Sequence, residues 1–226
     1  MKKEKAKKTV VLGGRTVYCY ETASLDVDPQ CGFSELCPQE LPVPGALEIV
    51  PELNRQSEIA GIRIASKDAH PYDAPWVATE KKPQLTKISG FKDLDLHWNR
   101  HCVPGTNGFE FLPGLDSEAY AFVAYKGIEP NKHPYGACYH DLANTESTGL
   151  IEFLIMNHIK NVIVGGLATS FCVKNTVVQL CTSGYFQVFV NLAACRDITG
   201  VNTDEAITEM ESAGAIIVQN LKGGKK

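Results

Sequence analysis

Short apolar runs alternate with segments of helical periodicity along most of the chain, and this alternation restricts the fold more than any other feature of the sequence. The apolar runs predict strands at 22–27, 61–66, 119–125, 161–166, 185–190 and 215–219. Apolar residues at helical spacing predict helices at 46–59, 146–159, 173–183 and 204–214. Strands that alternate with helices are typical of parallel sheets. The sequence therefore predicts an α/β fold in which helices flank both faces of a mainly parallel sheet.

The length of the chain favours one domain with two additions. A chain of 226 residues can bury a substantial core without disulfides, and we expect one domain over 1–226. The segment TVVLGGRTVYCY predicts two short strands around Gly13 and Gly14, so an extension with a hairpin is expected at 1–21. The stretch 70–118 is rich in loops, breaks the alternation and holds three histidines, which is typical of a functional excursion.

The charge balance and the cysteines exclude several classes of protein. With 26 acidic residues against 22 lysines and arginines, the chain is a poor candidate for general nucleic-acid binding. Its apolar runs are much shorter than a membrane span, so we expect no membrane association. Lysines crowd 2–8 and 222–226, which we expect to be solvated tails. Eight cysteines without a CxxC pair argue against a zinc ribbon and favour reduced thiols in the cytoplasm.

Chemically useful side chains follow four of the predicted strands. In open parallel sheets, ligands bind beyond the carboxyl ends of the strands, so the residues at these points are the first candidates for a site. The side chains found there are Asp28, Asp68, His70, Lys126 and Cys172. Because all four strand ends lie at one edge of such a sheet, we expect these side chains to meet there.

Cys172 is the candidate nucleophile of this group. It lies at the predicted N-terminus of a helix, where the helix dipole lowers a thiol pKa and free backbone N–H groups can hold an oxyanion. A nearby Lys126 would favour the thiolate, and Asp28 could accept the thiol proton. Taken singly, each has a plainer interpretation: a buried small apolar side chain for Cys172, a solvated loop residue for Lys126 and a turn or capping residue for Asp28.

Asp68, His70 and His101 are the candidate metal ligands. A D-x-H pair after a strand places two ligands on the same side of an extended segment, and a third ligand from a loop completes a facial site with open positions. Alternatively, His97 and His101 form one helical metal pair at i, i+4. The remaining histidines have no such company and are expected to be structural or exposed: His133, His140 and His158.

Five segments of the chain, in order, resemble the nicotinamidases (pyrazinamidases) of the isochorismatase-like cysteine hydrolases. They lie between about residues 22 and 219, and the segment around His101 is the most diagnostic of them. The segments are VDPQCGF at 27–33, SKDAHP at 66–71, HWNRHCVPGTNGFEFLPGL at 97–115, YKG at 125–127 and GGLATSFCVKNT at 165–176. The resemblance implies the isochorismatase-like three-layer α/β fold.

The resemblance also implies roles for the candidate residues. Cys172 would be the nucleophile, Asp28 the general base and acid, and Lys126 the group that stabilises their ionised forms. After a cis peptide at 167–168, the N–H groups of Ala168 and Cys172 would form the oxyanion hole. Two aromatic residues match family positions that sandwich the substrate ring: Phe33 and Trp98.

By the same resemblance, Asp68, His70 and His101 would bind a divalent metal that holds the pyridine nitrogen of the substrate. Zinc is the metal we expect, with iron or manganese as alternatives. The implied reaction converts nicotinamide to nicotinate and ammonia through a thioester, as part of NAD salvage, and extends to pyrazinamide-type amides. The expected partner is this small substrate, and a homo-oligomer is expected.

Two departures from the family pattern concern the site itself. Trp76 stands where many relatives carry another histidine, so we expect three protein ligands plus water, with His97 as an unassigned extra candidate. Ser170 replaces the aspartate of the family's nucleophile segment, and we expect it to retune the site. The competing hypotheses are an amidohydrolase that acts on a ureido or carbamoyl compound, a non-catalytic pyridine- or metal-binding protein, and an α/β protein with a merely buried thiol.

Overall fold

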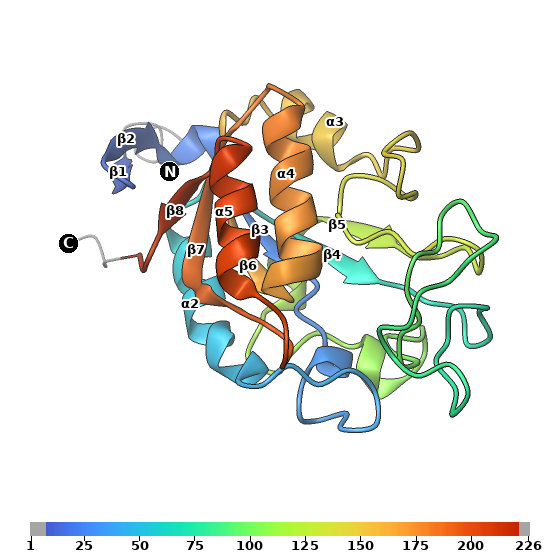
Figure 1. Ribbon diagram of the computed structural model, residues 1–226. Helices are drawn as coiled ribbons and strands as arrows, with labels where there is room; N and C mark the ends of the chain where they lie inside the picture. The colour runs from blue at the N-terminus through green and yellow to red at the C-terminus, as the bar shows by residue number, and fades with distance from the viewer. Residues whose placement is uncertain (1–7, 222–226) are drawn as a thin grey trace.

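A six-stranded parallel sheet forms the centre of the computed structural model, which describes residues 8–221 (Figure 1). Every neighbouring pair in the order β5-β4-β3-β6-β7-β8 is parallel. The strands are β3 (Thr22–Val27), β4 (Ile62–Asp68), β5 (Tyr120–Lys126), β6 (Asn161–Leu167), β7 (Gln187–Arg196) and β8 (Ile216–Val218). The predicted parallel sheet is therefore confirmed, with β7 running further than the apolar run at 185–190 indicates.

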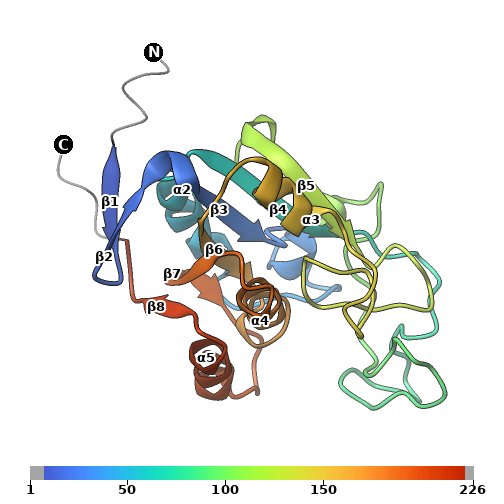
Figure 2. The ribbon, with the colours of Figure 1, turned by 90° about the horizontal axis from the view of Figure 1, so that it is seen from above.

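Helices cover both faces of the sheet, as predicted. Figure 2 shows α4 and α5 along one face and α2 on the other, while α3 packs near β5, where the rings of Phe122 and Phe153 stack 4.7 Å apart. The helices are α2 (Val50–Glu58), α3 (Leu150–Met156), α4 (Lys174–Thr182) and α5 (Thr203–Ser212).

Two of these helices are shorter than the periodicity predicts, for local reasons. Pro51 lies in the first turn of α2, where the missing N–H costs nothing, and a 3₁₀ turn at Ala46–Ile49 replaces the earlier part of the predicted helix. Gly149 precedes α3 with a φ of 85°, and His158 ends it with a φ of 55°. Left-handed residues of this kind interrupt a helix, so α3 is confined between them.

The N-terminal hairpin forms as predicted and packs beside the sheet. Strands β1 (Thr9–Leu12) and β2 (Arg15–Tyr18) pair antiparallel around Gly13 and Gly14, which both have positive φ. Its buried side chains join a small second core, which consists of Leu12, Val17, Ile163, Phe189 and Leu221. Of the expected lysine tails, Lys8 is exposed, and the other lysines lie outside the described residues.

The excursion between β4 and β5 has little regular structure, yet its apolar side chains join the main core. Trp76, Leu94, Trp98 and Leu112 are all at most 3% exposed. Isolated bridges such as that between Val77 and Trp98 replace long ladders. The excursion therefore holds its residues in fixed positions near the carboxyl ends of the strands (Figure 1).

A buried polar network fixes the strands that carry the site. The Asp26 carboxylate on β3 accepts hydrogen bonds from Arg63 on β4, from Gln56 on α2 and from Tyr120 on β5, at 2.7–2.9 Å. Because each donor comes from a different element, the network ties α2 to three neighbouring strands.

Among residues 8–221, no helix has the length and apolar character needed to cross a membrane.

Candidate active site

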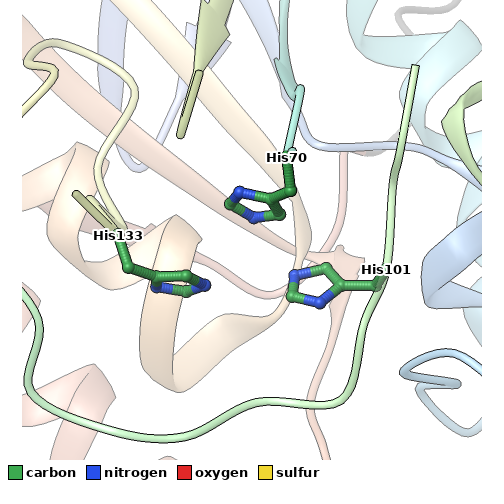
Figure 3. Close-up of side chains that lie close together, drawn as sticks. All are labelled: His70, His101 and His133. Atoms are coloured by element: carbon green, nitrogen blue, oxygen red, sulfur yellow. The ribbon is translucent and has the colours of Figure 1, made fainter. Parts of the chain in front are cut away.

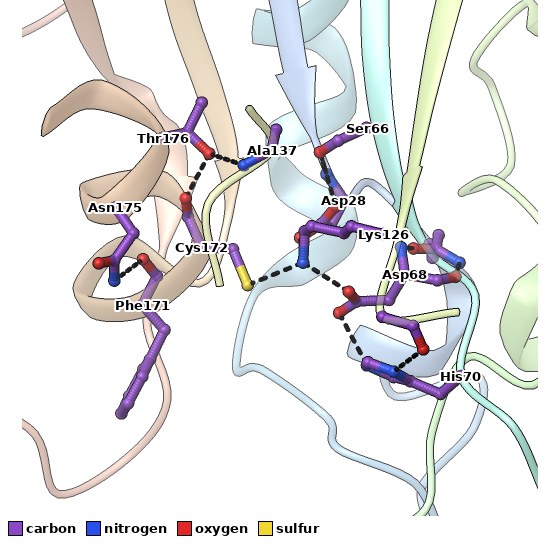
Figure 4. A network of polar contacts seen from close by, with 12 residues as sticks. Asp28, Ser66, Asp68, His70, Lys126, Ala137, Phe171, Cys172, Asn175 and Thr176 are labelled. Carbon is purple, nitrogen blue, oxygen red and sulfur yellow. Dashed lines mark hydrogen bonds and ion pairs between the residues drawn. The ribbon is translucent and has the colours of Figure 1, made fainter. Parts of the chain in front are cut away.

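The carboxyl ends of four strands bring together the side chains that the sequence singles out there. Asp28 follows β3, Asp68 ends β4, Lys126 ends β5 and Cys172 lies in the turn after β6 (Figure 4). The Lys126 ammonium lies 3.0 Å from Oδ2 of Asp28, contacts the Asp68 carboxylate and is 3.6 Å from Sγ of Cys172. One lysine therefore touches two carboxylates and the thiol.

Asp28 is a fully buried carboxylate with a raised pKa. Burial raises the pKa of Asp28 to about 6, although Lys126 works in the opposite direction. The Ser66 hydroxyl donates a hydrogen bond of 2.6 Å to Oδ1 of Asp28, which also favours the ionised form. Asp28 is thus poised to be ionised at neutral pH and to accept a proton.

Lys126 remains charged in spite of its complete burial. Burial alone would lower the pKa of Lys126, but Asp28 and Asp68 raise it well above its usual value. Burial would raise the pKa of Asp68, but Lys126 and the histidines His70 and His101 together hold the pKa of that carboxyl well below its usual range. The three groups therefore form a buried ion cluster with one positive and two negative charges.

The Cys172 thiol is protonated at rest, contrary to the lowered pKa expected from a helix N-terminus. Burial raises the pKa of Cys172 well above its usual value, and Asp28 and Asp68 add to this effect while Lys126 opposes it. Moreover, Cys172 is the fourth residue of a π-helical turn at Thr169–Val173, and α4 begins only at Lys174. The structure therefore indicates a thiol beside a carboxylate base rather than a preformed thiolate.

The nucleophile turn has the backbone feature that the resemblance implies. The peptide bond between Leu167 and Ala168 is cis. Ala168 and Cys172 both line the same pocket. A substrate carbonyl in that pocket would approach both residues, which is the placement that an oxyanion hole requires.

Three buried histidines form a candidate metal centre (Figure 3), and the Asp68 carboxylate lies beside two of them. Nitrogens of His70, His101 and His133 all lie within 4.8 Å of one another. Oδ2 of Asp68 lies 3.4 Å from Nε2 of His70 and 3.8 Å from Nε2 of His101. Nδ1 of His70 contacts the Gly127 carbonyl at 3.1 Å, and Nδ1 of His101 contacts the Asn99 carbonyl at 2.6 Å. These outer contacts leave Nε2 of both rings facing the cluster, as in metal sites.

His133 is buried in this cluster, so the expectation that it stands apart from the other candidate ligands is wrong. It is 4% exposed, and neither of its ring nitrogens has a hydrogen-bond partner among the described residues. Its ring stacks on His70 at 4.8 Å. Burying unpaired polar nitrogens is costly, and a shared metal ion would satisfy them. The donor set of one carboxylate and three imidazoles therefore fits a divalent transition metal.

Two further residues considered for the metal, His97 and Trp76, have other roles in the structure. His97 contacts the Trp76 carbonyl at 3.1 Å and is not part of the cluster, and residues 97–101 are not helical, so the helical pair does not form. Trp76 is fully buried, with its ring edge-on to His70 at 4.7 Å and to His133 at 4.5 Å. Trp76 therefore forms a wall of the cluster, and His133, from another loop, offers a fourth candidate donor.

A pocket lined mainly by apolar and aromatic side chains lies beside the thiol and the histidines. Phe33 and Trp98 line it, as expected, and so does Tyr135. The Trp98 indole N–H donates to the Tyr135 hydroxyl at 3.1 Å, and that hydroxyl donates to Asp95 at 2.8 Å, which fixes both rings. The full lining is Phe33, Leu41, Asp68, Trp98, His101, His133, Tyr135, Ala168, Phe171, Cys172 and Ile198. Such a pocket suits one small flat ring that carries a polar group.

Comparisons with known proteins find relatives over most of the chain. The model of the isochorismatase domain matches residues 22–220. The nicotinamidase of Escherichia coli is 33% identical over 157 residues, which cover 68% of this chain and 73% of that protein. The nicotinamidase of Acinetobacter baylyi is 30% identical over 196 residues, which cover 85% of this chain and 89% of that protein.

Solved structures are similar over most of the chain as well. A nicotinamidase/pyrazinamidase of Acinetobacter baumanii superposes with a TM-score of 0.80 at 27% identity, covering 88% of this chain and 96% of that one. The pyrazinamidase of Pyrococcus horikoshii, solved in complex with zinc, superposes with a TM-score of 0.68 at 29% identity, covering 88% of this chain and 99% of that one.

We predict that replacing His133 with alanine weakens metal binding, because the variant loses one nitrogen donor. The affinity for Zn²⁺ should fall by at least about tenfold, measured by competition with a chromophoric chelator and by metal analysis of the purified protein. His140→Ala is the matched control, because His140 is only half-buried in the same loop and is not part of the cluster. Equal Zn²⁺ affinity in the two variants would contradict the assignment of His133.

Proposed function

The chain belongs to the isochorismatase family, and from that premise we propose that it hydrolyses nicotinamide to nicotinate and ammonia. The observation that carries the proposal is the contact between Cys172 and the Lys126–Asp28 ion pair beneath a small aromatic pocket. The histidine cluster on the same pocket supports a substrate whose ring bears a nitrogen. The activity of the named relatives supports this choice of amide.

In the first half of the reaction, Asp28 acts as a base and then as an acid. Its carboxylate takes the proton of the Cys172 thiol, and the sulfur attacks the carboxamide carbon. The C–N bond then breaks as Asp28 returns that proton to the nitrogen, so ammonia leaves and a thioester remains on Cys172. Lys126 stays protonated throughout and compensates the negative charge as it moves between Asp28 and the sulfur.

In the second half, water replaces ammonia along the same route. Asp28 takes a proton from a water molecule, and the resulting hydroxide attacks the thioester carbon. The C–S bond breaks, and the proton on Asp28 returns to the Cys172 sulfur. The product leaves as nicotinic acid, which gives its proton to water or to the released ammonia and becomes nicotinate. The N–H groups of Ala168 and Cys172 hold the oxyanion in both halves, where one such donor contributes about 3 kcal/mol.

The candidate ligands would hold the metal, for which zinc is our first choice and iron or manganese the alternatives: Asp68, His70, His101 and His133. When bound, the ion supplies a Lewis-acidic position for the ring nitrogen of the substrate. The chain itself contributes the ring contacts: Phe33 and Trp98 would pack on the pyridine faces. This placement orients the carboxamide toward Cys172.

Four broader expectations remain proposals. We propose that 1–226 forms one catalytic domain and that the protein works in the cytoplasm, where nicotinate would feed NAD salvage. Free thiols support a reducing compartment, because no disulfide forms within residues 8–221. We also propose that the protein is a homo-oligomer.

The direct test of this function is ammonia release from nicotinamide by the metal-loaded protein. We predict turnover that is lost in Cys172→Ala and lost on chelation, with recovery on adding Zn²⁺. Cys181→Ala is the matched control, because Cys181 is a free thiol in α4 outside the pocket. Turnover that survives chelation would remove the metal from the mechanism. Absence of turnover with metal present would refute the proposal and favour a ureido or carbamoyl substrate.

The pH dependence should report Asp28. Because Asp28 must be ionised to accept the thiol proton and its pKa is about 6, kcat/KM should fall about tenfold per pH unit below that value. Ser66→Ala removes the hydrogen bond that lowers the pKa of Asp28, so its acid limb should move to higher pH. Ser57→Ala, which alters a hydroxyl on α2, should leave the limb in place. Identical pH profiles for the two variants would contradict this role.

A further inference from the structure

We propose that Asp197 is a positioning residue that holds the nucleophile turn against the wall of the substrate pocket; this inference rests on the function proposed above. Asp197 follows the last residue of β7 and does not line the pocket. Its carboxylate nevertheless contacts the turn at Thr169–Val173, which carries Cys172. It would therefore act on the reaction through the backbone of that turn.

The contacts of Asp197 with the nucleophile turn are made through Ser170. The Ser170 N–H lies 3.2 Å and 3.1 Å from the two carboxylate oxygens of Asp197. The Ser170 hydroxyl also donates a hydrogen bond to Oδ2 of Asp197. Backbone N–H groups at the start of a helical turn lack partners within the turn, so a carboxylate from another segment stabilises them well. Asp197 thus caps the turn from outside it.

The same carboxylate organises the connection that leads to α5. Oδ1 of Asp197 accepts a hydrogen bond of 3.0 Å from the Ile198 N–H, and Oδ2 accepts one of 2.8 Å from the Thr203 hydroxyl. The Ile198 side chain lines the substrate pocket. One side chain therefore links the nucleophile turn, one wall of the pocket and the start of α5.

A second anchor holds the turn from the opposite end (Figure 4). The Cys172 carbonyl accepts a hydrogen bond of 2.7 Å from the Thr176 hydroxyl, which itself accepts one of 2.9 Å from the Ala137 N–H. Ser170 and its bond to Asp197 lie two residues before Cys172. With only one anchor left, the turn could shift and move the Cys172 sulfur relative to Lys126. A displacement of about 1 Å in a reacting group lowers the rate of an enzyme reaction about 100-fold.

The hydrogen bond between Ser170 and Asp197 compensates for a difference between this chain and the family pattern. Ser170 stands where the nucleophile segment of the family, as given above, carries an aspartate. In this chain the carboxylate comes instead from Asp197, and the serine donates to it. The pair therefore keeps one carboxylate beside the turn but places it on the neighbouring strand connection. An exchange of the two side chains, Ser170→Asp with Asp197→Ser, would move the carboxylate back.

The experiment compares Asp197→Ala, Asp197→Asn and this exchanged double variant in metal-loaded protein. Asp204→Ala is the matched control, because Asp204 is an exposed carboxylate in the first turn of α5. Three quantities are measured: kcat, KM for nicotinamide and the affinity for nicotinaldehyde, whose thiol adduct places an oxyanion near Ala168 and Cys172. Melting temperature and metal content show that each variant is folded and loaded.

We expect Asp197→Ala to lower kcat by about 10- to 100-fold with little change in KM. The affinity for nicotinaldehyde should fall in parallel, Asp197→Asn should lie between, and the exchanged variant should recover most of kcat. If Asp197→Ala does not fold, the kcat and nicotinaldehyde affinity of Asp197→Asn and of the exchanged variant test the proposal in its place. A kcat equal to that of Asp204→Ala, or an unchanged nicotinaldehyde affinity, would overturn the proposal. So would an exchanged variant that is folded and loaded but recovers nothing.

A separate readout distinguishes this proposal from the function on which it rests. Wild-type protein without ammonia release would refute the nicotinamidase proposal alone. The alkylation rate of Cys172 by iodoacetamide, mapped by peptide mass, still tests the anchor. Because Cys172 is only 7% exposed, loosening the turn should accelerate its alkylation in Asp197→Ala but not in Asp204→Ala. Equal rates in these two variants would overturn the positioning role whatever the substrate.

Discussion

The buried ammonium of Lys126 is the interaction on which the rest of the site depends. It lies between the carboxylates of Asp28 and Asp68, both almost wholly buried, and it reaches the thiol of Cys172. Two carboxylates this close would repel each other strongly in a medium from which water is excluded. Lys126 removes this repulsion, so both carboxylates can remain ionised, one as a base and the other as a candidate metal ligand.

The buried ion cluster around Lys126 is also connected to the histidine cluster. Asp68 contacts Lys126 on one side and lies near His70 and His101 on the other, so the ion cluster and the histidine cluster share one side chain. The resting proton is on the Cys172 sulfur rather than on Asp28, because burial and two carboxylates outweigh the single lysine. On our account, the reaction therefore begins with proton transfer to Asp28 and does not require a stored thiolate.

The sequence was most informative where a local pattern determines the outcome. The apolar runs predict the sheet, and the rule that ligands bind at strand ends places Asp28, Lys126 and Cys172 at one edge of it, where the structure has them. His133 was missed because it follows β5 in an irregular loop, and no local pattern shows that this loop folds back onto His70. The sequence gives one indication of its role: His133 follows β5 seven residues after Lys126, so it lies in a loop at the carboxyl end of a strand that carries the site. The raised pKa of Cys172 was missed for a related reason: burial depends on the whole fold.

The covalent intermediate is the central claim, and mass spectrometry of the acid-quenched enzyme tests it most directly. Metal-loaded protein is mixed with nicotinamide, quenched within one turnover and digested for peptide mapping. We predict a mass increase equal to one nicotinoyl group on the peptide that contains Cys172, and no such increase in Cys172→Ala. Ammonia release without any adduct at that time, or an adduct on a different residue, would contradict the account.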